Sequence, residues 1–226
     1  MHNLAGKPLR YLIGGDDSDE GRDGEVIELS FDAEAPPERG IGIKYCNLFD
    51  EENSGDYGPY LKGTDVSKDY DEGQIDPRGP GWQKNLNDQF TRAKKQGFIY
   101  IELDNPDAYD VPDVVGAVSL AQKYGLKVVA KNPGLVDGDR KAYVGHPNVV
   151  GIIVEKDAGT PDQMDALRRS VNKPEMQVWF VAFGGGKAWA DKIAAAARQY
   201  KNMGVTYCHK GEYKTAADLL VPVVAA

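Results

Sequence analysis

Two acidic side chains lie at the end of one apolar segment in a pattern that could support chemistry. In the stretch GFIYIELDNPDAYD, residues 97–110, an apolar run carries Glu102 inside it and then breaks at Asp104. The apolar run predicts a buried strand, in which alternate residues share a face. Glu102 and Asp104 then share one face with Tyr100, while the residues between them, all apolar, form the other face.

Charged groups are not buried deep in a core without partners, so this pattern favours a site where the strand ends. Asp104 and Asn105 could instead cap a turn before Pro106, a common use of both residue types. A turn explains Asp104, but it does not explain Glu102, which still lies within the strand. We therefore predict a functional role for the pair.

A second apolar segment, VVGIIVEK, also ends in an acid, Glu155. Glu155 could form an ordinary ion pair with Lys156 or another base. Considered together with Glu102 and Asp104, it suggests glycosidic chemistry. Glycoside hydrolases use one carboxylate as nucleophile or base, and a second carboxyl group to protonate the leaving oxygen.

The segment between these two ends in AKN, which would bring Lys131 and Asn132 beside the acids. Lys131 could hold one carboxylate ionised, or it could belong to a routine ion pair. Asn132 could donate a hydrogen bond to a sugar hydroxyl.

The elements that must position these side chains alternate between strands and helices. Helical spacing of apolar residues over 82–97, with Gly97 at the end, predicts one helix. Similar patterns predict helices over 112–125, 160–170 and 187–204. Polar stretches at 15–24 and 50–81 are predicted to be loops. Eight strands with interleaved helices predict a single (β/α)₈ TIM barrel over residues 1–226, whose mouth holds the site. The predicted strands are 10–15, 25–31, 40–49, 97–105, 126–132, 149–156, 177–184 and 204–211.

Three motifs in this order resemble the glycoside hydrolase family 114 barrels, which include endo-α-1,4-polygalactosaminidases. They are GFIYIELDNPDAYD, YGLKVVAKNPGL and VVGIIVEKDAG. The segment DPRGPGWQKNLNDQFTRAKKQGF, before the first of them, also resembles the family. The resemblance covers roughly residues 75–156 and is weak outside that range. It departs from the family in AFGGGKAW, where an aromatic or polar contact is usual, and in thin loops in the first third.

The resemblance implies a retaining glycosidase that cleaves polysaccharide containing α-1,4-linked galactosamine. Asp104 corresponds to the nucleophile and Glu155 to the general acid/base. The strand IKYCNLF, followed by DEEN, corresponds to a family strand that contributes to substrate subsites, which adds Glu51 and Glu52 as candidates. The remaining candidate substrate-binding residues are Tyr45, Asn47, Glu102, Asn105, Asp107, Tyr109, Lys131, Asn132 and Trp179.

Composition narrows the class of partner. The chain has 27 Lys and Arg against 35 Asp and Glu, a net charge of −8. This charge argues against nucleic acid and anionic membranes as partners, and it suits a cationic or neutral carbohydrate polymer. No metal-ligand spacing and no nucleotide-binding fingerprint occurs, so no cofactor is predicted. Cys46 and Cys208 are predicted to be buried thiols. The start, MHNLAGKPLRYL, lacks a signal-peptide core, which leaves the cytoplasm and secretion after leader removal both open.

Two other functions are consistent with a barrel. Gly184, Gly185 and Gly186 come before a predicted helix, where backbone N–H groups could bind phosphate. A phosphosugar lyase or isomerase could then use Lys131 as a Schiff-base amine. Alternatively, a non-catalytic barrel could bind sugars by stacking on Trp179, Tyr109 and Trp189. For a tryptophan on a strand and a tryptophan on a helix, however, a place in the core is the more common case.

Overall fold

The computed structural model describes a large part of the chain. The described residues are 4–11, 21–50, 56–58, 73–133, 141–156, 173, 175–183, 191–192, 195, 198–199, 202–208 and 219–221. Several predicted features lie outside them, namely Glu51, Glu52, the helix at 160–170, Gly184–Gly186 and Trp189.

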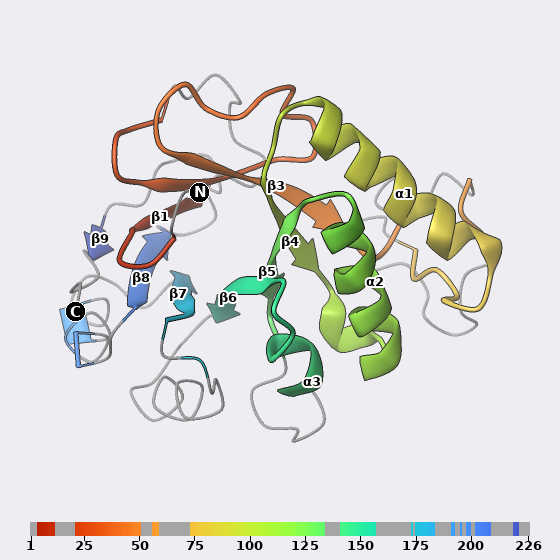
Figure 1. The fold of residues 1–226 in the computed structure, drawn as a ribbon. Coiled ribbons are helices and arrows are strands. Elements are labelled where there is room, and N and C mark those ends of the chain that lie inside the picture. The colour runs from red at the N-terminus through yellow and green to blue at the C-terminus, as the bar shows by residue number, and fades with distance from the viewer. Residues whose placement is uncertain are drawn as a thin grey trace.

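The described strands form one sheet whose order follows the chain, as Figure 1 shows. The first eight strands are parallel, and Thr206 on the eighth donates a hydrogen bond of 2.6 Å to the carbonyl of Leu9 on the first. This arrangement confirms the predicted (β/α)₈ barrel. It remains a prediction that a single domain includes all 226 residues. The structure adds β9, which pairs antiparallel with β8. The strands are β1 Leu9–Tyr11, β2 Val26–Leu29, β3 Ile41–Asn47, β4 Tyr100–Asp104, β5 Lys127–Lys131, β6 Val149–Lys156, β7 Gln177–Phe183, β8 Met203–Cys208 and β9 Leu219–Val221.

Two predicted helices are confirmed on the outer side of the sheet, α1 (Pro80–Lys95) and α2 (Val111–Lys123). Each has proline in its first turn, where no intrahelical N–H is needed. Each is followed by a glycine in the left-handed region, Gly97 at φ 88° and Gly125 at φ 74°. Two short helices, η1 (Pro106–Ala108) and α3 (Lys141–Val144), follow β4 and precede β6.

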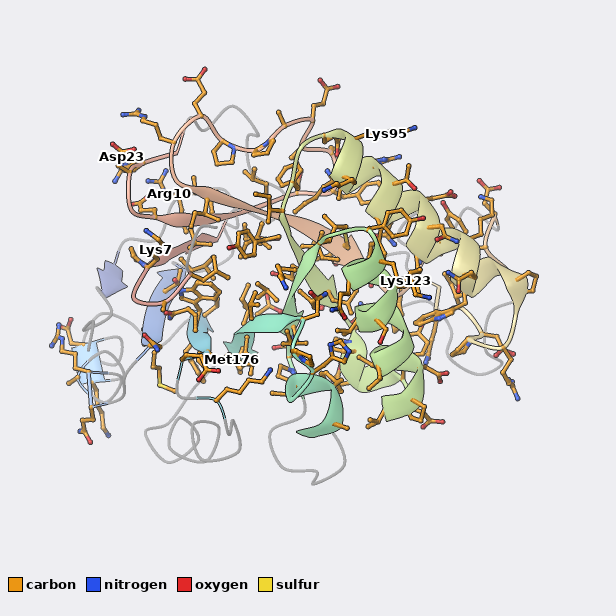
Figure 2. All side chains as sticks on the ribbon, in the orientation of Figure 1. Lys7, Arg10, Asp23, Lys95, Lys123 and Met176 are labelled. Carbon is orange, nitrogen blue, oxygen red and sulfur yellow. The ribbon has the colours of Figure 1, made fainter. Side chains whose placement is uncertain are left out.

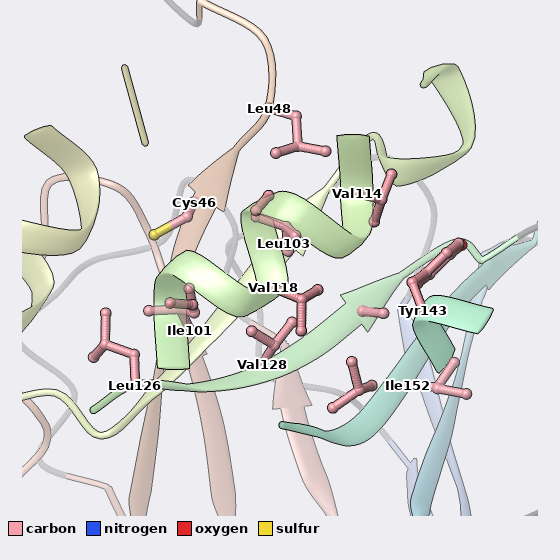
Figure 3. Packing of buried hydrophobic residues seen from close by; sticks show 14 of the residues in the cluster. Cys46, Leu48, Ile101, Leu103, Val114, Val118, Leu126, Val128, Tyr143 and Ile152 are labelled. Atoms are coloured by element: carbon pink, nitrogen blue, oxygen red, sulfur yellow. The ribbon is translucent and has the colours of Figure 1, made fainter. Parts of the chain in front are cut away.

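The strands separate two apolar cores. The outer core lies between the sheet and the helices, where Val114 and Val118 of α2 pack near Ile101 and Val128 of the strands, as Figure 3 shows. Cys46 is a buried thiol in this core, as predicted. The side chain of Cys208 lies outside the described part.

The inner core fills the barrel and includes the fully buried Trp179. The indole N–H of Trp179 donates a 2.8 Å hydrogen bond to the carbonyl of Lys7, before β1. The other members of the inner core are Leu4, Leu9, Val26, Ile41, Ile43, Tyr100, Val129, Ile153 and Val181.

The pairing of β5 with β6 shifts by one residue, and this shift decides which side chains of β6 point into the barrel. Val128 pairs with Val149, but Val129 pairs with Gly151. A Cβ on Gly151 would lie 3.1 Å from the Trp179 ring and 3.3 Å from Val129, which is tighter than ordinary packing. Glycine therefore accommodates the tryptophan inside the barrel, and Ile153 and Glu155, of the same parity, face inward with it.

Candidate active site

The acids and their partners lie at the carboxyl ends of β3, β4, β5 and β6. Register places Asn47 of β3 beside Asp104 of β4, and Tyr45 beside Glu102 one layer deeper. Lys131 ends the next strand, β5. The mouth of a TIM barrel at the C-terminal ends of its strands is where active sites of this fold occur.

Lys131 joins the acids of two strands. Its Nζ lies 3.0 Å from Oδ2 of Asp104, 3.3 Å from Oε2 of Glu155 and 3.6 Å from Oε1 of Glu102. Burial works to lower the pKa of Lys131, but the surrounding carboxylates outweigh it and raise this pKa well above its ordinary value. Lys131 is therefore a permanent ammonium group that holds Asp104 and Glu155 together.

Asp104 accepts hydrogen bonds from three sides. The Tyr45 hydroxyl and Lys131 both donate to Oδ2, at 2.8 Å and 3.0 Å. The backbone N–H of Asn105 donates to Oδ1 at 2.8 Å. Because every one of these partners is a donor, the site suits a carboxylate at this position and fixes its orientation.

Asn132 orients the second acid. Its side-chain amide donates to Oε2 of Glu155 at 3.1 Å, and its carbonyl accepts the backbone N–H of Glu155 at 2.8 Å. Asn105 and Asn132, which follow β4 and β5, both adopt left-handed backbone conformations, with φ of 58° and 45°. Asparagine tolerates this region better than most residues, and it lets each chain turn sharply where its strand ends.

A network of buried amides holds Asn47 in place, and local sequence patterns did not predict this network. Gln89 of α1 accepts the backbone N–H of Asn47 at 2.9 Å and donates to its carbonyl at 2.7 Å. The Asn47 side chain donates to the Tyr45 hydroxyl at 3.1 Å and accepts from Asn105 at 2.7 Å. Polar residues on the buried face of α1, Asn85 and Gln89, were the available signal.

Glu102 lies below these residues and is fully buried. Burial raises the pKa of its carboxyl to about 8, with Asp104 and Glu155 adding to the rise and Lys131 opposing it. Since it has no exposed surface, Glu102 cannot contact a substrate in this structure, contrary to its predicted substrate-binding role. Glu28 of β2 is another fully buried acid of the barrel interior, and it was not identified from the sequence. A single acid within the apolar segment EVIELSF was the signal, as it was for Glu102.

Glu102→Gln should change how stability depends on pH. An ordinary glutamate has a pKa near 4.5, so between that pH and about 8 the folded protein holds a proton that the unfolded chain has released. The free energy of unfolding of the wild type therefore falls as pH rises through this window, and Glu102→Gln removes that contribution. The difference amounts to several kcal/mol, since one unit of pKa is worth about 1.4 kcal/mol. Urea unfolding of both proteins at the two ends of the pH window measures this difference. An equal change in the free energy of unfolding in the two proteins would contradict the raised pKa of Glu102.

Three predicted site residues lie elsewhere. Trp179 is enclosed in the inner core and Tyr109 is buried against Trp82 and Phe49, so neither presents a ring for stacking on sugar. The Tyr109 hydroxyl donates to the carbonyl of Leu48 at 3.1 Å. Asp107 is exposed on η1.

The charged cluster contrasts with the outer surface, where side chains such as Asp23 and Lys95 extend into solvent, as Figure 2 shows. Within the described ranges no group of three or more His, Cys, Asp or Glu residues has the arrangement of a metal site. No helix among the described residues has the length and apolar character needed to cross a membrane.

Comparison with solved structures shows the same fold in two proteins. The glycoside hydrolase domain of PelA from Pseudomonas aeruginosa has a TM-score of 0.64 and 13% identity, over 95% of this chain and 98% of that one. Ega3 from Aspergillus fumigatus, solved as a complex with galactosamine, has a TM-score of 0.61 and 14% identity, over 90% of this chain and 92% of that one. No protein-family model and no curated protein sequence matches the chain. The barrel expected from the family resemblance is thus confirmed at the level of the fold.

Proposed function

We propose that this barrel is a glycoside hydrolase that cleaves polysaccharide containing α-1,4-linked galactosamine with retention of configuration. The observation that carries the proposal is the contact of one ammonium group, Lys131, with both Asp104 and Glu155 at the mouth of the barrel. Both distances are measured from Nζ of Lys131, so the contacted oxygens of Asp104 and Glu155 cannot be farther apart than 3.0 and 3.3 Å added together. This upper limit is shorter than the roughly 6.5–9.5 Å between the carboxyl groups of inverting enzymes, which leave room for a water molecule.

The proposed roles follow from the surroundings of each acid. Asp104 attacks the anomeric carbon, while the bond from that carbon to the leaving oxygen breaks and the oxygen takes a proton from Glu155. A water molecule then gives its proton to Glu155 and attacks the same carbon, which releases Asp104. Asp104 is the more enclosed of the two, with a side-chain exposure of 11% against 20% for Glu155. An oriented nucleophile and a more accessible proton donor fit these assignments.

The substrate class is supported by charge and by the structural likeness. A galactosamine unit carries an amine that is cationic when protonated, and this chain has a net charge of −8. Ega3, which shares the fold, was solved with galactosamine bound. Two of the predicted substrate contacts, Asn105 and Asn132, flank the two acids, although both amides already bond within the site.

The lyase alternative receives no support from the lysine it would require. A Schiff-base amine must be neutral in order to attack a carbonyl. Lys131 instead lies among carboxylates that raise its pKa well above the ordinary value. The glycine-rich loop that would bind phosphate, Gly184–Gly186, lies outside the described residues.

Incubation with galactosamine-rich α-1,4-polysaccharide tests the proposal directly. Release of new reducing ends, with oligosaccharides identified by mass spectrometry, is expected for the wild type. Binding of the polymer without any release would instead indicate a carbohydrate-binding barrel that retains the acids.

Glu155→Gln should affect substrates according to their leaving groups. The glutamine cannot donate a proton, so turnover of the polymer should fall by roughly 10²–10⁴-fold, the usual contribution of general acid–base catalysis. An aryl glycoside with an acidic phenol needs little protonation, so its first step should be much less affected. Steady-state and burst kinetics on both substrates measure the contrast. Equal losses on both would argue against Glu155 as the acid.

A further inference from the structure

Glu28 is a buried acid in an unusual environment. It has no exposed surface, and neither of its carboxyl oxygens has a hydrogen-bond partner among the described residues. Within the described part of the chain, the two carboxyl oxygens of Glu102 likewise lack hydrogen bonds, and the cation beside them, Lys131, lies 3.6 Å away. An ionised carboxylate without donors is strongly disfavoured in such an interior, whereas the neutral acid has a much smaller desolvation cost.

The barrel architecture brings these two acids into one compartment. Glu28 is on β2 and Glu102 on β4, and inward side chains of alternate strands share layers in a TIM barrel. Apolar side chains of the inner core adjoin the acids, since Ile43 pairs in register with Glu28 and Val129 with Glu102. Above them lies the ammonium group of Lys131.

We propose that Glu28 and Glu102 are positioning residues, a buried pair of neutral carboxylic acids that leaves the charge of Lys131 to Asp104 and Glu155. The described titratable and charged groups around the pair include Tyr45 on β3, Tyr100 and Asp104 on β4, Lys131 on β5 and Glu155 on β6. The consequence for catalysis rests on the proposed function, but the protonation of the pair does not.

The order of distances supports this arrangement. Lys131 is closer to Asp104 and Glu155 than to Glu102, as expected if Glu102 carries no charge. Burial is the largest cause of the raised pKa of both Glu28 and Glu102, and negative charge on Glu102 further raises the pKa of Glu28. The raised pKa of Glu102 places its ionisation at a pH of about 8. Its new charge then competes for Lys131, so turnover should decline as pH rises through that value.

Infrared spectroscopy of the protein without substrate tests the protonation. The C=O stretch of a protonated carboxyl group is separate from the carboxylate and amide bands. Near neutral pH the wild type should show a protonated-carboxyl signal, and Glu28→Gln and Glu102→Gln should each remove a distinct part of it. Glu25→Gln is the matched control, because Glu25 is also buried but its carboxyl group lies 2.7 Å from the guanidinium group of Arg10, in an ion pair. It should leave the signal intact.

A second experiment compares the pH profiles of turnover. Turnover by the wild type should fall as pH rises through about 8, and in Glu102→Gln this decline should be absent or displaced upward. A pH titration of the wild-type infrared signal needs no variant and covers the case in which a substitution prevents folding. Absence of the signal near neutral pH, or a signal that both glutamine variants leave intact, would overturn the proposal. If the signal behaves as expected while no glycan is cleaved, the pair stands and the proposed function fails.

Discussion

Asp104→Asn should abolish turnover of galactosamine polysaccharide while leaving the protein folded. The amide is isosteric but a far weaker nucleophile, so the covalent intermediate no longer forms. A loss of at least about 10³-fold in kcat is expected, since removing a residue of a catalytic unit costs rates of that order or more. Reducing-end release under saturating polymer measures it.

The thermal midpoint of this variant should change little. Asp104 is one of four carboxyl side chains near a single ammonium group, so its removal lessens repulsion as well as attraction. Lys131 keeps its contacts with Glu155 and Glu102. Asp23→Asn, on the exposed surface, is the matched control and should retain wild-type turnover. Undiminished activity of Asp104→Asn would remove Asp104 from the mechanism.

Lys131→Met should cost both activity and stability. Methionine fills a similar volume but leaves Asp104 and Glu155 without the positive charge that holds them together. Breaking a buried ion pair by removing one partner typically costs about 3–5 kcal/mol. For a chain of 226 residues this corresponds to a fall in Tm of roughly 6–20 °C. Thermal and urea unfolding measure the loss, and polymer turnover should fall to background.

The pH dependence of the stability of Lys131→Met distinguishes an electrostatic loss from a packing defect. Ionised carboxylates repel one another once the lysine is absent, and protonation relieves that repulsion. The stability deficit of Lys131→Met should therefore shrink as pH falls through the ordinary carboxyl range. Lys44→Met is the control, because Lys44 is another fully buried strand lysine, and its Nζ donates to the carbonyls of Phe31 and Ala33 at 2.7 Å. Its deficit should not follow the carboxyl titration. If the two deficits had the same pH profile, the central role of Lys131 would be wrong.

Local patterns were sufficient to predict much of this protein. Apolar runs of strand length, proline in first turns and glycine after last turns placed the strands and both long helices. Acids that follow apolar runs also indicated that β4 and β6 end at a site. These features are readable because each depends on residues within one element and its immediate flanks.

The direction of the β6 side chains could not be predicted from local patterns. The segment VVGIIVEK is apolar on both faces, so alternation cannot indicate which parity enters the barrel. The register shift beside Gly151 decides it, because the tryptophan ring of β7 requires a residue without a side chain there. Without the register shift, the other alternate residues of β6 would face the barrel interior, and Glu155 would point outward toward the helices.

The sequence by itself determined the order of strands and helices, the barrel class and the presence of acids at strand ends, because these follow from periodicity and turn chemistry. Only the tertiary structure decided that Lys131 joins Asp104 to Glu155, that Glu28 lies in the same interior as Glu102, and that Trp179 fills the core instead of a sugar subsite. Each of these depends on which distant strands become neighbours and in what register. Burial and charge coupling are properties of that assembled neighbourhood, and no single segment encodes them.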